Sequence, residues 1–159
     1  MVSLWAIDMA DKFPGAQVIA TDLSPIQPEW VPPNVQFQVD DCETAWDFSQ
    51  SFDLVHMRNL AGSIADWPQL VKAAYNNLNP GGYLEVVDWQ KCQTDDNSLS
   101  QDSKLFKWQD EVRSAAATFG REMDTTSKLK GWMTDAGFIE VREEVLKVSP
   151  VVGRIEVHR

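Results

Sequence analysis

The sequence predicts an α/β fold in which helices cover both faces of a mostly parallel sheet. Short apolar runs typical of strands alternate along the chain with stretches of helical periodicity. Such alternation implies right-handed crossovers between parallel strands. The 159 residues, of which 43% are hydrophobic, suffice for one domain with its own core, so we expect a single domain over residues 1–159. In this class ligands bind beyond the carboxyl ends of the strands.

Charge and cysteine content narrow the possible partners. The chain has 14 Lys and Arg against 24 Asp and Glu, a net charge of −10, so we expect neither nucleic acid nor an anionic membrane surface as a partner. Cys42 and Cys92 form neither a disulfide framework nor a zinc-binding spacing, and we expect no metal. No signal peptide or bilayer-spanning segment is recognisable, so we expect a cytoplasmic or nuclear protein.

The first third of the chain predicts one helix and two strands. Leu4 to Phe13 has apolar residues about one helical turn apart and is expected to be a helix, which Pro14 and Gly15 end. Gln17 to Thr21 is a short apolar run typical of a buried strand. The proline-rich stretch from Ser24 to Asn34 is expected to be a loop, and Val35 to Val39 alternates as a strand does.

The middle of the chain predicts a strand, a helix and a second strand. Phe52 to Met57 is expected to be a strand, and Asp66 is expected to begin a helix with an Asp-x-x-Gln capping arrangement. The turn Asn79-Pro80-Gly81-Gly82 should end that helix. Tyr83 to Val87 should then resume as a strand.

The last third predicts a loop, two helices and a long strand. Lys91 to Ser103 is polar and is expected to be a loop, followed by a helix from Lys104 to Phe119 with Gly120 as its cap. A further helix should begin at Thr125 or Thr126 and reach Ala136, where Gly137 closes it. Polar and apolar residues alternate well enough from Phe138 to Val148 to predict a long strand with one solvent-exposed face.

Two acidic residues at strand ends are candidate nucleoside ligands. Asp22 follows an apolar run, where a carboxylate can accept hydrogen bonds from both hydroxyls of a ribose; alternatively it caps the following turn. Asp41, with Cys42 after it, can meet the amine and a ring nitrogen of adenine, although a solvated turn is the simpler interpretation.

Other strand ends carry candidates for the chemistry. Met57 with Arg58, and Asp88, each follow an apolar run. Asp88 could take a proton from a bound substrate, or be an ordinary solvated carboxylate. His56 could act as a base, but a histidine in an apolar run is more often a hydrogen-bonded core residue. No catalytic residue is therefore assigned, and Asp88 and His56 are kept as candidates.

Three segments together resemble one family. VIATDLSPIQPEWVPPNVQFQVDDCE, FDLVHMRNLAGSIADWPQL and LNPGGYLEVVDW closely resemble the fungal class I S-adenosylmethionine-dependent methyltransferases of the LaeA-like group, which contains the regulator of secondary metabolism. The resemblance implies a Rossmann-like sheet, S-adenosylmethionine as cofactor and a small-molecule or protein methyl acceptor. It places the ribose at Asp22 and the adenine at Asp41. The cofactor-binding residues expected on this basis are Asp22, Leu23, Asp41, Cys42, Met57 and Arg58.

The chain departs from that family at its start. The family's first strand and glycine-rich turn are not found, and no Gly-x-Gly occurs, so we expect a sheet lacking its first central strand, between the strands ending at Asp22 and Met57. A truncated gene product would explain this, and so would a degenerate paralogue. The resemblance also gives no support for a seventh strand in VVGRIEVHR. A non-catalytic interaction module and a nicotinamide-dependent oxidoreductase remain as alternative functions, and the helix from Lys104 to Phe119 is the expected cover over the acceptor.

Overall fold

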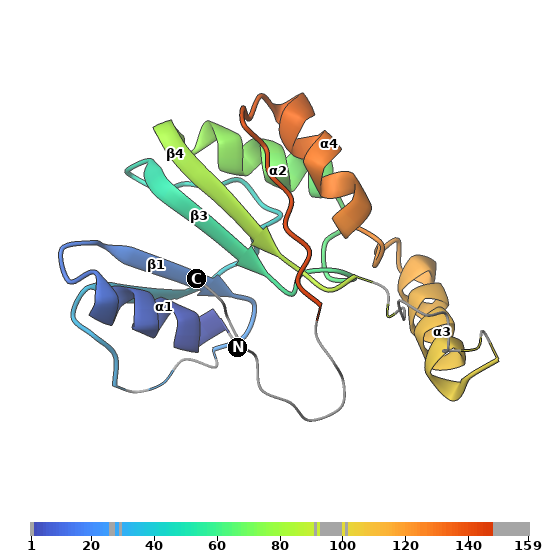
Figure 1. The fold of residues 1–159 in the computed structure, drawn as a ribbon. Helices are drawn as coiled ribbons and strands as arrows, with labels where there is room; N and C mark the ends of the chain where they lie inside the picture. The colour runs from blue at the N-terminus through green and yellow to red at the C-terminus, as the bar shows by residue number, and fades with distance from the viewer. Residues whose placement is uncertain are drawn as a thin grey trace.

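The computed structural model describes residues 2–25, 28, 30–90, 92, 100 and 102–147. Helices and strands alternate as expected over most of this length (Figure 1). In chain order the elements are α1 (Val2–Lys12), β1 (Val18–Asp22), β2 (Val35–Val39), β3 (Phe52–Arg58), α2 (Trp67–Asn76), β4 (Leu78–Val87), α3 (Lys104–Thr118) and α4 (Thr126–Ala136). The α/β fold class is therefore confirmed.

The strands pair in parallel, but they form two separate ribbons. β1 pairs with β2 in a register that runs from Val18 opposite Val35 to Asp22 opposite Val39. β3 pairs with β4, also in parallel. Among the described residues no ladder of backbone hydrogen bonds joins β1 to β3. From the sequence, we expect the family's first central strand to be missing at this same position, between β1 and β3.

The Asn79-Pro80-Gly81-Gly82 turn lies inside β4 and interrupts its pairing. Phe52 is opposite Leu78 while Leu54 is opposite Tyr83, so β4 contains extra residues at this point. Gly81 has a φ of 84°, a conformation that favours glycine. The strand thus begins at Leu78, earlier than the Tyr83 that the sequence predicted, because the turn is accommodated as an irregularity and does not precede the strand.

The main hydrophobic core lies between the β3–β4 ribbon and the helix pair α2 and α4. Asp66 begins α2 as predicted, and its Oδ1 accepts a hydrogen bond from the Gln69 N–H at 2.9 Å. The indole rings of Trp67 and Trp132 stack across the two helices with centroids 6.2 Å apart. Thr125 precedes α4 as expected, but its side chain makes no capping hydrogen bond.

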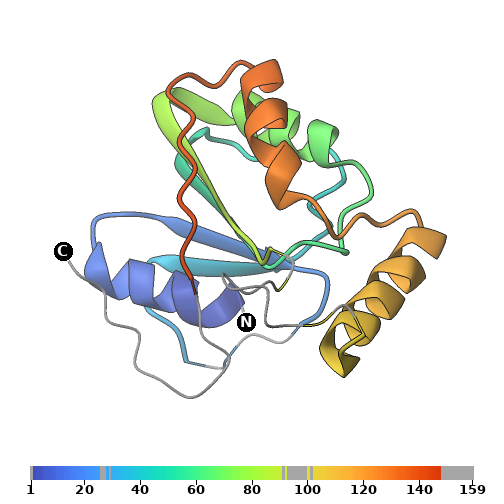
Figure 2. The same ribbon diagram turned by 45° about the vertical axis from the view of Figure 1, so that its right-hand side comes forward.

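The helices cover opposite faces of the strand layer (Figures 1 and 2). Met57 of β3 is buried in the core under α2 and α4. The neighbouring His56 points to the other face, because successive side chains of a strand alternate. There its ring stacks on Trp5 of α1, with centroids 3.8 Å apart. Both faces of the layer are therefore covered in part, as the fold class requires.

α3 begins and ends close to the predicted limits. The Ser103 hydroxyl accepts a hydrogen bond from the Phe106 N–H at 3.3 Å at its start. Phe119 is its C-terminal cap, and Gly120 follows with a φ of 68°. Both ribbon views show α3 projecting at one side of the molecule, beyond the strands (Figures 1 and 2).

The predicted strand from Phe138 to Val148 is wrong over the part that is described. Residues 138–147 form neither strand nor helix, and Val148 lies outside the described residues. Alternating polar and apolar residues indicate only that one face is exposed to solvent and the other is buried, whereas a strand also needs a neighbouring strand to hydrogen-bond with. Ile139 is 86% exposed, and Glu140 has a φ of 55°, which breaks the extended conformation.

Two further expectations fall mainly on residues that are not described. The loop from Lys91 to Ser103 is described only at residues 92, 100, 102 and 103, and the tail after Lys147 is not described at all. Within the described ranges no helix has the length and apolar character needed to cross a membrane.

Candidate functional site

The carboxyl ends of the strands point to the side of the molecule where α3 lies (Figures 1 and 2). Asp22 is the last residue of β1, and its carbonyl accepts a hydrogen bond from the Asp40 N–H, just after β2, at 3.1 Å. In the other ribbon, the carbonyl of Val87 accepts from the Asn59 N–H at 3.0 Å, so the ends of β3 and β4 also meet. The segments that follow the strands therefore form the candidate site.

Asp22 lies at the end of β1 with a half-exposed side chain. Its Oδ1 accepts a hydrogen bond from the Ser24 N–H at 3.0 Å, which is the turn-capping role considered from the sequence. A carboxylate has several acceptor positions, so one hydrogen bond leaves it able to bind hydroxyl groups as well. Leu23, directly after it, is 70% exposed and presents an apolar surface beside the carboxylate.

Asp41 and Cys42 form a tight turn directly after β2. The Asp41 carboxylate accepts a hydrogen bond from the Glu43 N–H at 2.9 Å, and its carbonyl accepts from the Thr44 N–H and hydroxyl. Cys42 is half-buried against the hydrophobic core. Burial raises the pKa of the Cys42 thiol, and the charges of Asp41 and Glu43 raise it further, so the thiol stays protonated and unreactive.

Met57 and Arg58 differ in what they can offer to a ligand. The Met57 side chain is 6% exposed and packs in the core under α2, so only its backbone can reach the strand end. Arg58, the last residue of β3, has an exposed side chain.

The two candidate catalytic side chains are both engaged in contacts within the protein. The Asp88 Oδ2 accepts hydrogen bonds from the N–H groups of Leu60 and Ala61 at 2.9 and 2.7 Å, and its Oδ1 accepts from the Trp89 N–H. The His56 Nδ1 lies 2.7 Å from Glu85 Oε2 on the neighbouring strand, and its ring stacks on Trp5. These contacts fix both side chains in structural positions.

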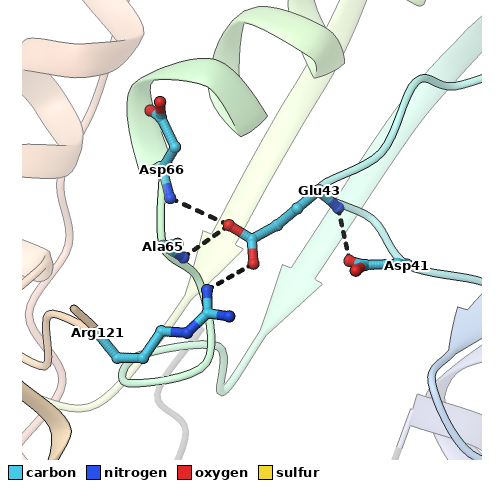
Figure 3. A network of polar contacts seen from close by, with 5 residues as sticks. All are labelled: Asp41, Glu43, Ala65, Asp66 and Arg121. Carbon is cyan, nitrogen blue, oxygen red and sulfur yellow. Dashed lines mark hydrogen bonds and ion pairs between the residues drawn. The ribbon is translucent and has the colours of Figure 1, made fainter. Parts of the chain in front are cut away.

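Glu43 is a candidate site residue that the sequence analysis did not select. Its Oε1 accepts hydrogen bonds from the N–H groups of Ala65 and Asp66 at 2.6 and 3.1 Å, and its Oε2 accepts from Arg121 Nη1 at 2.7 Å (Figure 3). Burial by itself raises the pKa of Glu43, but the Asp66 and Ala65 N–H groups and the Arg121 guanidinium outweigh burial and lower it. The carboxylate is therefore held in its charged form.

Glu43 and Asp88 together hold the loop between β3 and α2 from two sides. Asp88 binds the start of this loop and Glu43 binds its end, both through backbone N–H groups. The partners of Glu43 lie 22, 23 and 78 residues away along the chain. The available sequence signal was weak: an acid two residues after Asp41, and an arginine directly after the glycine that was expected to cap a helix.

A small hollow of about 190 Å³ lies beside this network. It is bounded by the turn from Cys42 to Thr44 and by the start of α2, including Asp66, Gln69 and Leu70. Neither Asp22 nor Asp41 lines it, so the hollow does not unite the two candidate nucleoside ligands.

Comparison with known proteins identifies the family. A model of the methyltransferase domain family matches residues 3–143. The methyltransferase pytC of Aspergillus terreus is 37% identical over 147 residues, which cover 91% of this chain and 45% of that protein. The secondary metabolism regulator LAE1 of Cochliobolus heterostrophus is 38% identical over 149 residues, covering 91% of this chain and 48% of that protein. The protein-methionine methyltransferase laeA of Emericella nidulans is 34% identical over 148 residues, covering 90% and 39%. The chain thus spans less than half the length of these relatives.

Proposed function

Since the chain belongs to the methyltransferase domain family, we propose that it serves S-adenosylmethionine-dependent methyl transfer to a small-molecule or protein acceptor. The observation that carries the proposal is the pair of acids, Asp22 and Asp41, that follow neighbouring parallel strands at the carboxyl edge. We place this activity in the cytoplasm or nucleus.

The residues at this edge suit the adenosine part of the cofactor. Asp22 offers a half-exposed carboxylate for the ribose hydroxyls, and Leu23 offers an apolar surface next to it. Asp41 and Cys42 form a turn whose carboxylate and backbone can bind the adenine edge. Arg58 is the exposed side chain at the end of β3, and the backbone of Met57 completes the expected set. These groups fit the adenosine part of the cofactor in chemistry.

The protein's own task in such a reaction is to align the reactants and exclude water. The cofactor, when bound, supplies an activated methyl group on a sulfonium, so little acid or base chemistry is compulsory. The Asp88 carboxylate accepts hydrogen bonds from three backbone N–H groups, and the His56 side chain is only 9% exposed with its Nε2 buried, so neither is poised to remove a proton from an acceptor. We therefore favour an acceptor atom with no proton to lose, such as a thioether sulfur, the group that the name of the Emericella nidulans relative indicates for that protein.

Calorimetric titration with S-adenosylmethionine tests the proposal directly. Asp22→Ala should weaken binding by about 2–4 kcal/mol, roughly 30-fold to 1,000-fold, because two ribose hydroxyls lose a charged acceptor. Asp11→Ala is the matched control, since Asp11 is exposed in the last turn of α1, before the start of β1, and should leave the affinity unchanged.

The outcomes separate the alternative functions. An unchanged affinity in Asp22→Ala would show that Asp22 is only a turn cap. Binding of a nicotinamide dinucleotide in place of S-adenosylmethionine would favour an oxidoreductase. No binding of either compound by a folded chain would favour a non-catalytic interaction module.

A further inference from the structure

One carboxylate joins three segments that are far apart in the sequence. Glu43 accepts hydrogen bonds from two backbone N–H groups of the loop before α2 and one from the Arg121 guanidinium (Figure 3). The side chains of Glu43 and Arg121 are 21% and 34% exposed. Because these hydrogen bonds are charge-assisted and partly shielded from water, they hold the three segments more firmly than an ion pair on the open surface would.

Glu43 is connected to the turn that carries Asp41. The Glu43 N–H donates to Asp41 Oδ1 at 2.9 Å, within the same turn after β2. A shift of the Glu43 backbone therefore moves the carboxylate that is proposed to meet adenine. The side chain of Glu43 points away from that carboxylate, toward the loop before α2 and Arg121 (Figure 3).

Arg121 is connected to α3. Its N–H donates to the carbonyl of Ala116 in the last turn of α3, at 3.0 Å. Arg113 of α3 also forms an ion pair with Asp124 in the linker that leads to α4. The position of Arg121 and the position of α3 are thus tied to each other.

We propose that Glu43 is a positioning residue whose ion pair with Arg121 couples the Asp41 turn to α3. This inference rests on the proposed function, in which Asp41 meets adenine, and on the expectation from the sequence that the helix from Lys104 to Phe119 covers the acceptor. A ligand that orders the Asp41 turn favours one position of Glu43, hence one position of Arg121 and of α3. By linkage, an ordered α3 strengthens ligand binding by the same factor.

Hydrogen exchange of the full chain, with and without S-adenosylhomocysteine, tests this coupling. In the unmodified chain the ligand should slow amide exchange both in the Asp41 turn and in α3. Arg121→Gln removes the charge that reaches Glu43 but leaves the hydrogen bonds from Ala65 and Asp66. In this variant the ligand should still protect the turn but no longer protect α3, and its affinity should fall about fivefold or more.

Two further variants separate coupling from a general loss of structure. Glu122→Gln removes an exposed ion pair with Lys128, one residue along the same linker, and should behave like the unmodified chain. Arg121→Lys keeps the charge and should restore part of the protection of α3. A Gln variant that unfolds would be recognised by faster exchange throughout, and the Lys variant would then decide.

Each outcome supports or overturns a specific statement. Ligand protection of α3 that persists in a folded Arg121→Gln variant would overturn the coupling, and so would its complete loss in a folded Arg121→Lys variant. A ligand that protects only the turn in the unmodified chain would overturn it as well. In each of these cases the proposed function would stand, because the ligand would still bind. If the unmodified chain does not bind S-adenosylhomocysteine at all, the proposed function fails and the coupling fails with it.

Discussion

The two strand ribbons are supported by very different sets of buried side chains. Around β3 and β4 the core contains large residues such as Trp67, Leu70 and Val71, each at most 2% exposed. Around β1 and β2, the buried apolar residues of the described chain are alanines. They are Ala6, Ala10 and Ala20.

This difference implies unequal stability along one chain. Burying a large apolar side chain contributes about 1.5–3 kcal/mol, and an alanine contributes much less. Both ribbons consist of two strands within the described residues, so strand pairing does not offset this difference. We expect the α1–β1–β2 half to open at lower free energy than the half around β3 and β4.

Contacts across the boundary hold the α1–β1–β2 half, here called the weaker half, to the stronger half around β3 and β4. The rings of Trp5 and His56 are stacked with an angle of 7° between their planes, which joins α1 to β3. Glu43 joins the turn after β2 to the loop before α2. Both candidate nucleoside ligands, Asp22 and Asp41, belong to the weaker half, so the proposed site depends on these contacts.

The largest expected effect comes from removing a buried side chain of the stronger half. Leu70→Ala should lower the free energy of unfolding by about 2–5 kcal/mol, because the side chain is 1% exposed and its loss leaves a cavity. Ile7→Ala in α1 is the matched change in the weaker half and should cost about 1 kcal/mol, because Ile7 is only half-buried. Denaturant titration of both variants measures the difference, and equal losses would contradict the comparison.

A smaller effect is expected from removing the side-chain amide of Asn34 in the weaker half. The Asn34 Nδ2 donates to the carbonyls of Ala10, Phe13 and Ala16, with distances of 2.9–3.3 Å, and so ties the end of α1 to the start of β2. Asn34→Ala should cost about 1–2 kcal/mol, because these carbonyls lose their donor. Amide exchange should rise in α1, β1 and β2 before it rises in β3 and β4.

Asn76→Ala is the control for that change. Asn76 is exposed at the end of α2 and should alter neither the stability of the weaker half nor its amide exchange. If Asn34→Ala instead accelerates exchange equally in both ribbons, the two halves unfold as one unit and the contrast in their cores has no energetic consequence.

Local patterns predicted the elements well because each pattern has a local physical cause. The Asp-x-x-Gln cap before α2 and the Gly137 at the end of α4 act within a few residues of the chain. The predicted strand after Phe138 failed because strand formation depends on a neighbour that periodicity does not report. A helix cap depends on residues a few positions away, whereas the pairing of two strands depends on residues that are far apart in the sequence.

The candidate site shows the same limit. Asp22 and Asp41 could be chosen from the sequence because both follow apolar runs that end at one edge of a parallel sheet. Glu43 could not be chosen, because its charged partner, Arg121, lies 78 residues later. The sequence also could not show that Asp88 would be occupied by two backbone N–H groups of a loop that begins at the end of another strand.

The smallest expected effect is the pH dependence of stability that comes from Glu43 at the boundary between the two halves. Although burial opposes it, the hydrogen bonds from Asp66, Ala65 and Arg121 lower the pKa of Glu43. A carboxylate whose pKa is lowered by folding stabilises the protein fully above its ordinary pKa of about 4.3, and this contribution is lost as the pH falls through the lowered value. Between neutral pH and pH values below about 4, the unmodified chain should therefore lose more stability than Glu43→Gln, by about 1 kcal/mol or less.

Urea titrations of both chains across this range measure the effect. Glu143→Gln, which changes an exposed glutamate outside the network, should follow the unmodified chain at every pH. If Glu43→Gln also follows it, the carboxylate contributes nothing to stability through its charge. The two halves would then be held together by apolar contacts such as that of Trp5 with His56. Protonation of Glu43 would not weaken the boundary between them.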